Sequence, residues 1–385
     1  MTPAEAMRLA IEEGRKGLTT VSPNPAVGAV ILESNGALLS KGFHHKAGEP
    51  HAEIEALKNI SPNHTFPLIG TPGEAFAQKL KGAQMFVTLE PCAHHGRTPP
   101  CAEALAKLPF ASVTYGLVDP NPKVSGQGAA IMNRAGVKAE LFSGLRRELE
   151  ELAEIFLHNM RSQMPFVAVK VATSLDGKIG RKDKPFPQWL TGPEARLHVH
   201  YLRACYDAIL VGRKTVEVDD PGLNIRHPDH SKENKVIVLD SNKQLLPTIT
   251  NRNIFKTHKP ENIFLVFRGR DFKSSIDPDS GVTLVSCPDL DEGDGLELEF
   301  LLKYLYQENK IASIFVEGGV HTFGPFFKHN LVQRLYHFRA PVLIGDDVGW
   351  DWKENFQPDL RLDFENSEAY QIGEDQLITG RINKA

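Results

Sequence analysis

The chain has 385 residues, of which 41% are hydrophobic and 24% charged, and its formal net charge is −4 at pH 7. This length is too great for one ordinary hydrophobic core and favours two domains, while the charge argues against a nucleic-acid partner. Four cysteines are too few for a disulfide framework. Because no signal-peptide pattern or long apolar run is present, we expect a cytoplasmic protein with no membrane partner.

The first part of the chain alternates helix and strand patterns, as layered α/β domains do. Thr2, Pro3 and Glu5 have the types expected at the N-cap, first position and capping box of a helix over 3–16. Further helices are predicted over 51–59, 101–107, 126–135 and 145–160. Strands are predicted over 26–33, 84–90, 112–118 and 137–142. We therefore expect one domain over 1–145, followed by a helical linker over 146–165.

Pro165 ends the helical pattern and favours extended chain, so we place the second domain at 166–385. Its acidic stretch at 289–300 is expected to be a loop that leads into a helix. A hairpin is expected at the end of the chain. The predicted strands lie near 166–174, 207–211, 235–240, 262–267, 282–286, 313–317 and 334–344.

A His-x-Glu pair, His51 and Glu53, begins a predicted helix, and Cys92 and Cys101 follow a strand about forty residues later. One imidazole and two thiolates leave the fourth position of a catalytic zinc open for water, whose pKa zinc lowers toward neutrality. Glu53 is then placed to move a proton from that water to a departing amine. The alternative is a histidine on the surface or satisfied in the core, with two cysteines that are small core residues.

The strings PNPAVGAVI, GFHHKAGEPHAE, LEPCAHHGRTPPC and DPNPKVSGQG resemble the deaminase half of the bifunctional deaminase–reductase family of riboflavin biosynthesis. The cysteines are further apart than in the Pro-Cys-x-x-Cys motif of other zinc deaminases. The resemblance implies a cytidine-deaminase-like three-layer fold, with His51, Cys92 and Cys101 as zinc ligands and Glu53 as the proton shuttle. It also implies a pyrimidine ribonucleotide substrate.

That substrate would be surrounded by Asn24, His44, His94, Arg97, Asp119 and Asn121. Asn24 and Asn121 stand beside prolines, so a role in turns is the alternative for both. The segment near 61–82, between the two zinc motifs, is longer than the family leads us to expect, and we interpret it as a surface insertion.

In the second domain no Gly-x-Gly-x-x-Gly motif follows a strand, so a Rossmann site is not indicated. Instead, VKVATSLDGKIG, QWLTGPEARLHVHYLRACYDAILVGRKTVEVDDPGLNIR and SIFVEGGVHTFGPFF have strands that lead into glycine-containing turns and helix starts. Main-chain amides at such turns bind phosphate. In this order the strings resemble the reductase half of the same family, which implies a dihydrofolate-reductase-like fold and NADPH as cofactor.

The resemblance implies NADPH contacts from Thr173, Trp189, Thr215, Asp219, Gly318, Gly319, Val320, His321 and Thr322. It implies substrate contacts from Lys170, Arg203, Leu223, Arg226 and Glu317. Trp189 has the alternative role of a core aromatic residue, and Arg203 that of a solvated helix position. Pro187 stands where the family often has serine, and it has no N–H to donate to a substrate.

We therefore expect a bifunctional enzyme that forms a homo-oligomer. The first domain would hydrolytically deaminate 2,5-diamino-6-ribosylamino-4(3H)-pyrimidinone 5′-phosphate, and the second would reduce the ribosyl group to ribityl with NADPH. One alternative is a nucleoside or tRNA deaminase joined to a domain of unrelated use. Another is a structural zinc module with a nucleotide sensor, but such a site has no use for Glu53.

Overall fold

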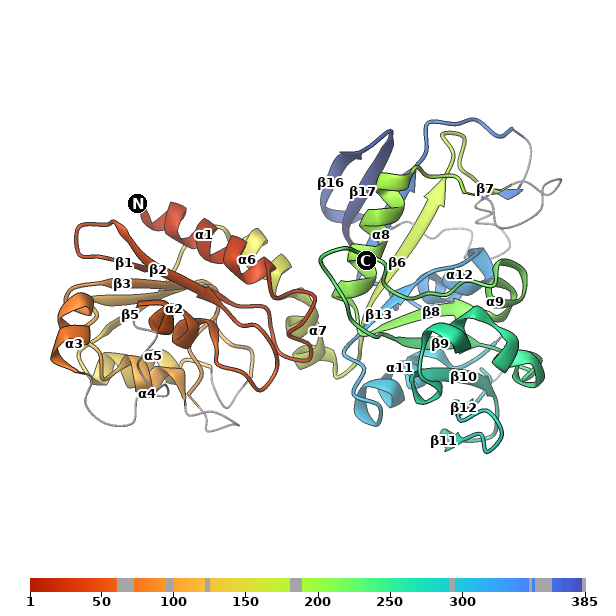
Figure 1. The fold of residues 1–385 in the computed structure, drawn as a ribbon, viewed down its shortest axis with the longest axis horizontal. Helices are drawn as coiled ribbons and strands as arrows, with labels where there is room; N and C mark the ends of the chain where they lie inside the picture. The colour runs from red at the N-terminus through yellow and green to blue at the C-terminus, as the bar shows by residue number, and fades with distance from the viewer. Residues whose placement is uncertain are drawn as a thin grey trace. The chain divides into compact units, whose positions relative to one another are not determined.

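The computed structural model describes residues 1–60, 73–93, 100–121, 125–180, 189–290, 295–345, 348–349 and 362–382. The chain divides into two compact units, Met1–Ser162 and Gln163–Ala385 (Figure 1). Within the described ranges, no helix combines the length and apolar character needed to cross a membrane.

The first unit is an α/β domain whose elements largely follow the predicted pattern. Its strands are β1 (Gly28–Leu32), β2 (Leu38–Phe43), β3 (Gln84–Val87), β4 (Ser112–Tyr115) and β5 (Lys138–Leu141). Its helices are α1 (Pro3–Arg15), α2 (Ala52–Ile60), α3 (Glu74–Leu80), α4 (Cys101–Leu105), α5 (Gln127–Arg134), α6 (Arg146–Leu152) and α7 (Glu154–Ser162). The capping box predicted at Thr2 and Glu5 is present.

The described strands of this unit form one sheet in the order β2-β1-β3-β4-β5, antiparallel between β2, β1 and β3 and parallel from β3 to β5. Side chains alternate between the two faces of β1. Ala29 and Ile31 pack in a core with α2, α4 and α5, whereas Val30 and Leu32 pack in a second core with α1 and α6. Helices thus cover both faces of the sheet, and the predicted three-layer arrangement is confirmed (Figure 1).

Residues 146–162, which we expected to be a long helix in a linker, are instead two helices of the first unit. The break falls at Ala153, where φ is −104° and ψ is 11°. Leu149, Leu152 and Leu157 are buried in the same core as α1. A Cβ added at Gly116 would lie 2.5 Å from Leu149 Cδ2, so the absence of a side chain there lets α6 approach the sheet closely.

The second unit is a larger α/β domain. Its strands are β6 (Phe166–Thr173), β7 (Lys178–Gly180), β8 (Ala208–Gly212), β9 (Lys235–Leu239), β10 (Ile263–Arg268), β11 (Lys273–Ile276), β12 (Thr283–Cys287), β13 (Ser313–Val316), β14 (Arg334–Arg339), β15 (Val348–Gly349), β16 (Phe364–Ile372) and β17 (Asp375–Ile382). Its α-helices are α8 (Pro193–Cys205), α9 (Arg213–Asp219), α10 (Asn253–Thr257), α11 (Leu298–Gln307) and α12 (Val320–Lys328). Two short 3-10 helices are η1 (Leu246–Asn251) and η2 (Pro260–Asn262).

Ten of the described strands form one sheet in the order β11-β12-β10-β9-β8-β13-β6-β14-β17-β16. The run from β12 to β14 is parallel. At its two ends β11 and β17 pair antiparallel with it, and the edge strand β16 pairs antiparallel with β17. Ala208 and Leu210 face a core with α11 and α12, while Ile209 and Val211 face a core with α9 and α10. The carboxyl ends of the central parallel strands therefore lie at one edge of this layered domain, where α/β folds form ligand sites.

Several expected boundaries differ from the structure. The strand predicted over 334–344 ends at Arg339, and Pro341, which lacks an N–H for the sheet ladder, follows soon after. The strands β2, β7, β11 and β15 and the helix α3 were not predicted. The polar β11 lies at a sheet edge with all four residues exposed, so it carries no alternation of buried and exposed side chains.

Candidate active sites

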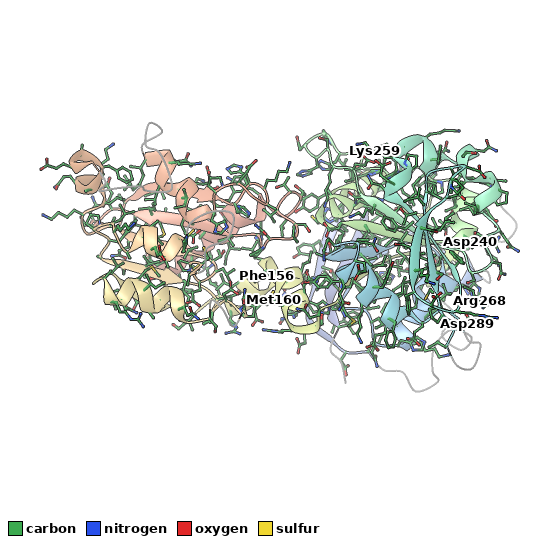
Figure 2. The ribbon with its side chains drawn as sticks, turned by 90° about the horizontal axis from the view of Figure 1, so that it is seen from below. Phe156, Met160, Asp240, Lys259, Arg268 and Asp289 are labelled. Atoms are coloured by element: carbon green, nitrogen blue, oxygen red, sulfur yellow. The ribbon has the colours of Figure 1, made fainter. Side chains whose placement is uncertain are left out.

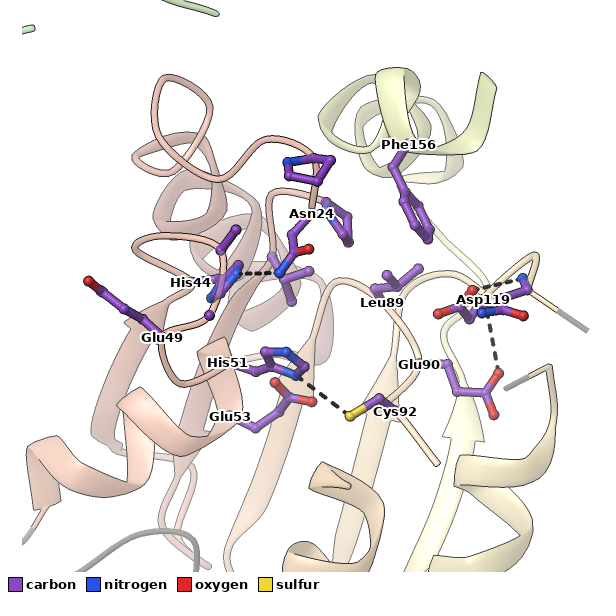
Figure 3. A pocket seen from close by; sticks show the side chains of 16 residues that line it. Asn24, His44, Glu49, His51, Glu53, Leu89, Glu90, Cys92, Asp119 and Phe156 are labelled. Carbon is purple, nitrogen blue, oxygen red and sulfur yellow. Dashed lines mark hydrogen bonds between the residues drawn. The ribbon is translucent and has the colours of Figure 1, made fainter. Parts of the chain in front are cut away.

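The three predicted metal ligands lie together in the first unit. His51 directly precedes α2, Cys92 lies on the turn after β3, and Cys101 begins α4. His51 Nδ1 lies 3.6 Å from Cys92 Sγ (Figure 3). It lies 3.4 Å from Cys101 Sγ, and all three potential ligand atoms lie within 4.8 Å of one another. A tetrahedral zinc holds sulfur and nitrogen ligands about 3.6 Å apart, so this geometry fits zinc.

The protonation of this cluster also suits a metal. A hydrogen bond from the Cys101 thiol, together with one from His51, lowers the pKa of Cys92 to about 4. The hydrogen bond with Cys92 raises the pKa of His51 to about 9. Cys92 is therefore held as a thiolate, the form that binds metal, and metal binding would release the remaining protons from Cys101 and His51.

Glu53 lies in the first turn of α2, close to the metal-ligand cluster, with only 3% of its surface exposed (Figure 3). Burial raises the pKa of its carboxyl group. A buried carboxyl group beside the cluster is placed to take up and release a proton, which is what general acid–base chemistry requires.

A cavity of about 480 Å³ opens above the cluster, a volume typical of small-molecule sites. His51, Glu53 and Cys92 line it, together with four residues predicted to contact substrate: Asn24, His44, Asp119 and Asn121. The other two predicted contacts, His94 and Arg97, lie outside the described residues. The structure therefore brings together every described residue of the predicted deaminase site except Cys101, which contributes through the metal-ligand cluster.

Asn24 and His44 form a fixed pair on one side of the cavity (Figure 3). His44 Nδ1 lies 3.0 Å from the carbonyl oxygen of Pro50, and His44 Nε2 lies 3.0 Å from Asn24 Nδ2. The ring therefore donates from Nδ1 and accepts from the Asn24 amide at Nε2. Burial lowers the pKa of His44, which favours this neutral form. The Asn24 amide is thus oriented by its neighbour, in addition to any role in the turn.

Glu90 was not predicted as a site residue. It is 3% exposed, and its carboxylate accepts hydrogen bonds from the backbone N–H groups of Asp119, Gly126 and Ala129 at 3.4, 3.0 and 3.3 Å. Glu90 therefore ties the turn that carries Cys92 to the turn that carries Asp119 and to the start of α5. The sequence signal was a charged residue at the end of an otherwise apolar strand.

In the second unit, three predicted substrate residues form a charged cluster, in which Arg203 and Glu317 are largely buried and Lys170 is half-buried. Arg203 Nε and Nη2 donate to the Glu317 carboxylate at 2.6 and 3.1 Å, and each of the two side chains is 11% exposed. Burial lowers the pKa of Lys170, an effect that the negative charge of Glu317 partly opposes. Arg203 is therefore not on a solvated helix face, which was the alternative considered for it.

The other two predicted substrate residues differ from each other. Arg226 is exposed, and its Nη1 donates to Asn224 Oδ1 at 3.0 Å. Leu223 has a φ of 52° and a side chain that is 3% exposed in the core formed with α9 and α10. The side chain of Leu223 therefore does not face a site, and only its backbone is free to contact a ligand.

Most of the predicted cofactor residues converge at the ends of β8 and β13. Gly318 has a φ of 126°, and a Cβ added there would lie 3.2 Å from Thr215 Oγ1 and 3.4 Å from Thr322 Oγ1. Gly319 is the N-cap of α12, so the N–H groups of Val320 and His321 belong to its open first turn. These glycines form an exposed backbone shelf at a helix N-terminus, which suits an anionic ligand.

Asp219 ends α9 nearby, and its Oδ1 is buried without a hydrogen-bond partner among the described residues. A buried carboxylate oxygen of this kind is normally paired, so its position suits a ligand that supplies a donor. Thr173 is 1% exposed, and its hydroxyl lies 2.8 Å from His337 Nε2. Trp189 is 69% exposed, which excludes the core role considered for it, and the Arg196 guanidinium lies 5.1 Å from its ring centre.

Comparisons with known families agree with these two sites. Residues 2–117 match the family described as the cytidine and deoxycytidylate deaminase zinc-binding region, and residues 165–377 match the RibD C-terminal domain. The riboflavin biosynthesis protein RibD of Haemophilus influenzae is 36% identical over 357 residues, covering 89% of this chain and 87% of its own. RibD of Escherichia coli is 34% identical over 356 residues, covering 89% and 88%.

Solved structures give the same result over nearly the full length. Acinetobacter baumannii RibD (form 1) has a TM-score of 0.80 at 31% identity, covering 99% of both chains. A diaminohydroxyphosphoribosylaminopyrimidine deaminase/5-amino-6-(5-phosphoribosylamino)uracil reductase from Thermotoga maritima has a TM-score of 0.80 at 29% identity, also covering 99% of both chains. The predicted fold, a cytidine-deaminase-like domain followed by a reductase domain, is confirmed. The chain therefore belongs to the RibD family of riboflavin biosynthesis, and is a bifunctional enzyme with an N-terminal deaminase domain and a C-terminal reductase domain.

Proposed function

We propose that the first unit hydrolytically deaminates 2,5-diamino-6-ribosylamino-4(3H)-pyrimidinone 5′-phosphate, and that the second reduces the ribosyl group of the product to ribityl with NADPH. The observation that carries the first assignment is the placement of Glu53 beside the His51, Cys92 and Cys101 cluster at the base of the cavity. The Thermotoga maritima relative is named as both a deaminase and a reductase, and this name supports the two assignments.

A zinc ion held by His51, Cys92 and Cys101 would supply Lewis-acid activation of water at neutral pH. In hydrolysis the water oxygen bonds to the ring carbon that carries the 2-amino group, and the carbon–nitrogen bond breaks to release ammonia. Glu53 takes a proton from the water and delivers it to the departing nitrogen. Asn24, held by His44, and the Asp119 side of the cavity orient the ring above the cluster.

In the second unit, reduction breaks the bond between the anomeric carbon and the ring oxygen of the ribosyl group. The carbon takes a hydride, which NADPH supplies when bound, and the oxygen takes a proton. The shelf at Gly318 and Gly319 suits the pyrophosphate of the cofactor. The half-buried Lys170 and the buried Glu317 are the polar groups that would face the sugar.

Arg226 is better suited than Arg203 to anchor the substrate phosphate. The guanidinium of Arg203 already donates to both oxygens of Glu317 and to the Asn224 carbonyl. Arg226 is exposed and makes one side-chain hydrogen bond through Nη1 to Asn224, which leaves further donors for a phosphate. We therefore assign Arg203 to holding Glu317 in place.

One assay tests the whole proposal. The enzyme is incubated with the diaminopyrimidine phosphate, with and without NADPH, and the products are identified by mass. We expect the deaminated ribosyl compound without NADPH and the ribityl compound with it. Unchanged substrate under both conditions would contradict the proposal.

We expect one zinc ion per chain in the purified protein, because the described residues provide one cluster of suitable ligands. The double variant Cys92→Ala/Cys101→Ala should lose that zinc, since one histidine alone does not hold it. Metal analysis by mass spectrometry checks both statements. The matched control, Cys205→Ala/Cys287→Ala, removes two thiols outside the cluster and should retain one zinc. Retention of zinc by the first variant would contradict the ligand assignment.

We also expect NADPH to support reduction at least tenfold more efficiently than NADH, which corresponds to about 1.4 kcal/mol in transition-state binding. Charge-assisted hydrogen bonds to one phosphate supply this much. The candidate donors are Lys214, Ser241 and Lys243. Steady-state kcat/KM values for both cofactors check the ratio, and Lys214→Gln and Lys243→Gln show which cation contributes to it. Equal efficiency with the two cofactors would contradict the assignment.

A further inference from the structure

One aromatic side chain in the deaminase cavity comes from outside the region that matches the deaminase family. Phe156 lies on α7, whereas the family match ends at residue 117. The side chain points from α7 into the cavity, toward Leu89, which follows β3 (Figure 3). The cavity is therefore completed by a helix that follows the matched region.

The packing of α7 holds Phe156 in this position. Leu157, the next residue, is 5% exposed and buried in the same core as Leu152 and Ala153. Phe156 is partly buried and packs against that core, which also contains Leu89. Because its neighbours anchor the helix, the Phe156 ring is a fixed wall of the cavity rather than a side chain on a free linker.

The groups that line the cavity divide by chemistry. His44, Glu53 and Asp119 supply hydrogen-bonding and proton-transfer groups, whereas Leu89 and Phe156 supply apolar surface. A pyrimidine ring has polar edges and two apolar faces, so a site that binds it needs both kinds of contact. Apart from histidines, Phe156 is the one aromatic residue among the described residues that line the cavity. Aromatic rings pack favourably on one another.

We propose that Phe156 is a substrate-binding residue of the deaminase site, whose ring packs against the bound pyrimidine above Glu53 and the metal-ligand cluster. This inference rests on the proposed deaminase function. It assigns to α7 a direct part in substrate binding.

The test measures binding and turnover separately. Binding of the diaminopyrimidine phosphate is measured by calorimetry in the Glu53→Gln variant, which blocks proton transfer. Adding Phe156→Ala should weaken binding at least tenfold, which corresponds to about 1.4 kcal/mol. Phe156→Tyr should restore binding to within threefold. In enzyme that keeps Glu53, Phe156→Ala should raise KM by a similar factor while kcat changes less than threefold.

Met160 provides the matched control, because it lies one turn further along α7 than Phe156 (Figure 2). It is not among the residues that line the cavity. Met160→Ala should bind the ligand like the parent protein. Binding within twofold of the parent in Phe156→Ala would overturn the inference, as would equal weakening in Met160→Ala. If Phe156→Ala fails to fold, Phe156→Leu keeps a large apolar side chain without the ring. Weaker binding by that variant supports the inference, and unchanged binding overturns it.

The two levels of the proposal fail differently. If the otherwise unaltered enzyme releases no ammonia but ligand binding depends on Phe156, the proposed deaminase function is wrong and the binding role of Phe156 is supported. If the enzyme releases ammonia and binding does not depend on Phe156, the function stands and this inference fails.

Discussion

Glu53→Gln should lower the rate of ammonia release about 1,000-fold or more while one zinc ion per chain remains bound. The variant keeps the size of the side chain but removes the carboxyl group that takes up and delivers the proton, and such transfers contribute about 10²- to 10⁴-fold to rates. Zinc remains because Glu53 is not part of the ligand cluster of His51, Cys92 and Cys101. The measurement is single-turnover ammonia release, with metal content determined on the same sample.

Glu49→Gln is the matched control, because Glu49 also lines the cavity but is exposed and lies outside the cluster. It should deaminate within a few-fold of the parent protein. Reduction of substrate that has already been deaminated should continue in Glu53→Gln, since the second unit has its own core and site. Loss of both activities together, or loss of zinc from Glu53→Gln, would contradict the role given to Glu53.

Glu317→Ala should destabilise the second unit by about 3–5 kcal/mol and abolish reduction, because it leaves a buried cation without its partner. Arg203 loses both hydrogen bonds to this carboxylate, and Lys170 loses the nearby negative charge. Chemical denaturation checks the loss, with the transition of the second unit followed separately, since a two-domain chain need not unfold in one step. The control is Glu299→Ala, which removes an exposed ion pair with Lys303 and should cost less than about 1 kcal/mol.

The contribution of Glu317 should also depend on pH. Burial opposes its ionisation, but Arg203 and then Lys170 outweigh burial and lower the pKa below the usual 4.5. A carboxyl group whose pKa is lower in the folded than in the unfolded state stabilises the fold. This stabilisation is complete above the unfolded-state pKa and is lost as the pH falls through the folded-state pKa. The difference in stability between parent and Glu317→Ala should therefore be largest at neutral pH and shrink in acid. A difference that grows below pH 4.5 would contradict this account.

The grouping of His51, Cys92 and Cys101 could be predicted from the sequence because its signal is local. His51 and Cys101 stand at helix starts and Cys92 at the end of a strand, so the order of elements already brings them to one edge of the sheet. Glu90 and Phe156 were missed because their roles depend on tertiary contacts. The pattern of α7 indicates a buried face, but no local rule tells which domain buries it.

The second unit shows the same limit. The glycine turn after β13 was recognisable because backbone shelves of this kind need glycine. The sequence alone does not tell whether Trp189 is buried or exposed, since an aromatic residue fits equally in a core or on a surface. Its 69% exposure follows from the fold. Leu223 was assigned to the substrate by resemblance, but its positive φ turns the side chain into the core.

The burial of α6 and α7 in the first unit restricts where evolution is able to divide this gene. A breakpoint near residue 117 or 145 would strip Leu149, Leu152 and Leu157 from their core and leave an apolar surface on the remaining half. A breakpoint after Ser162 leaves that core whole. Single-activity descendants and recombinants of this lineage should therefore inherit both helices with the deaminase half.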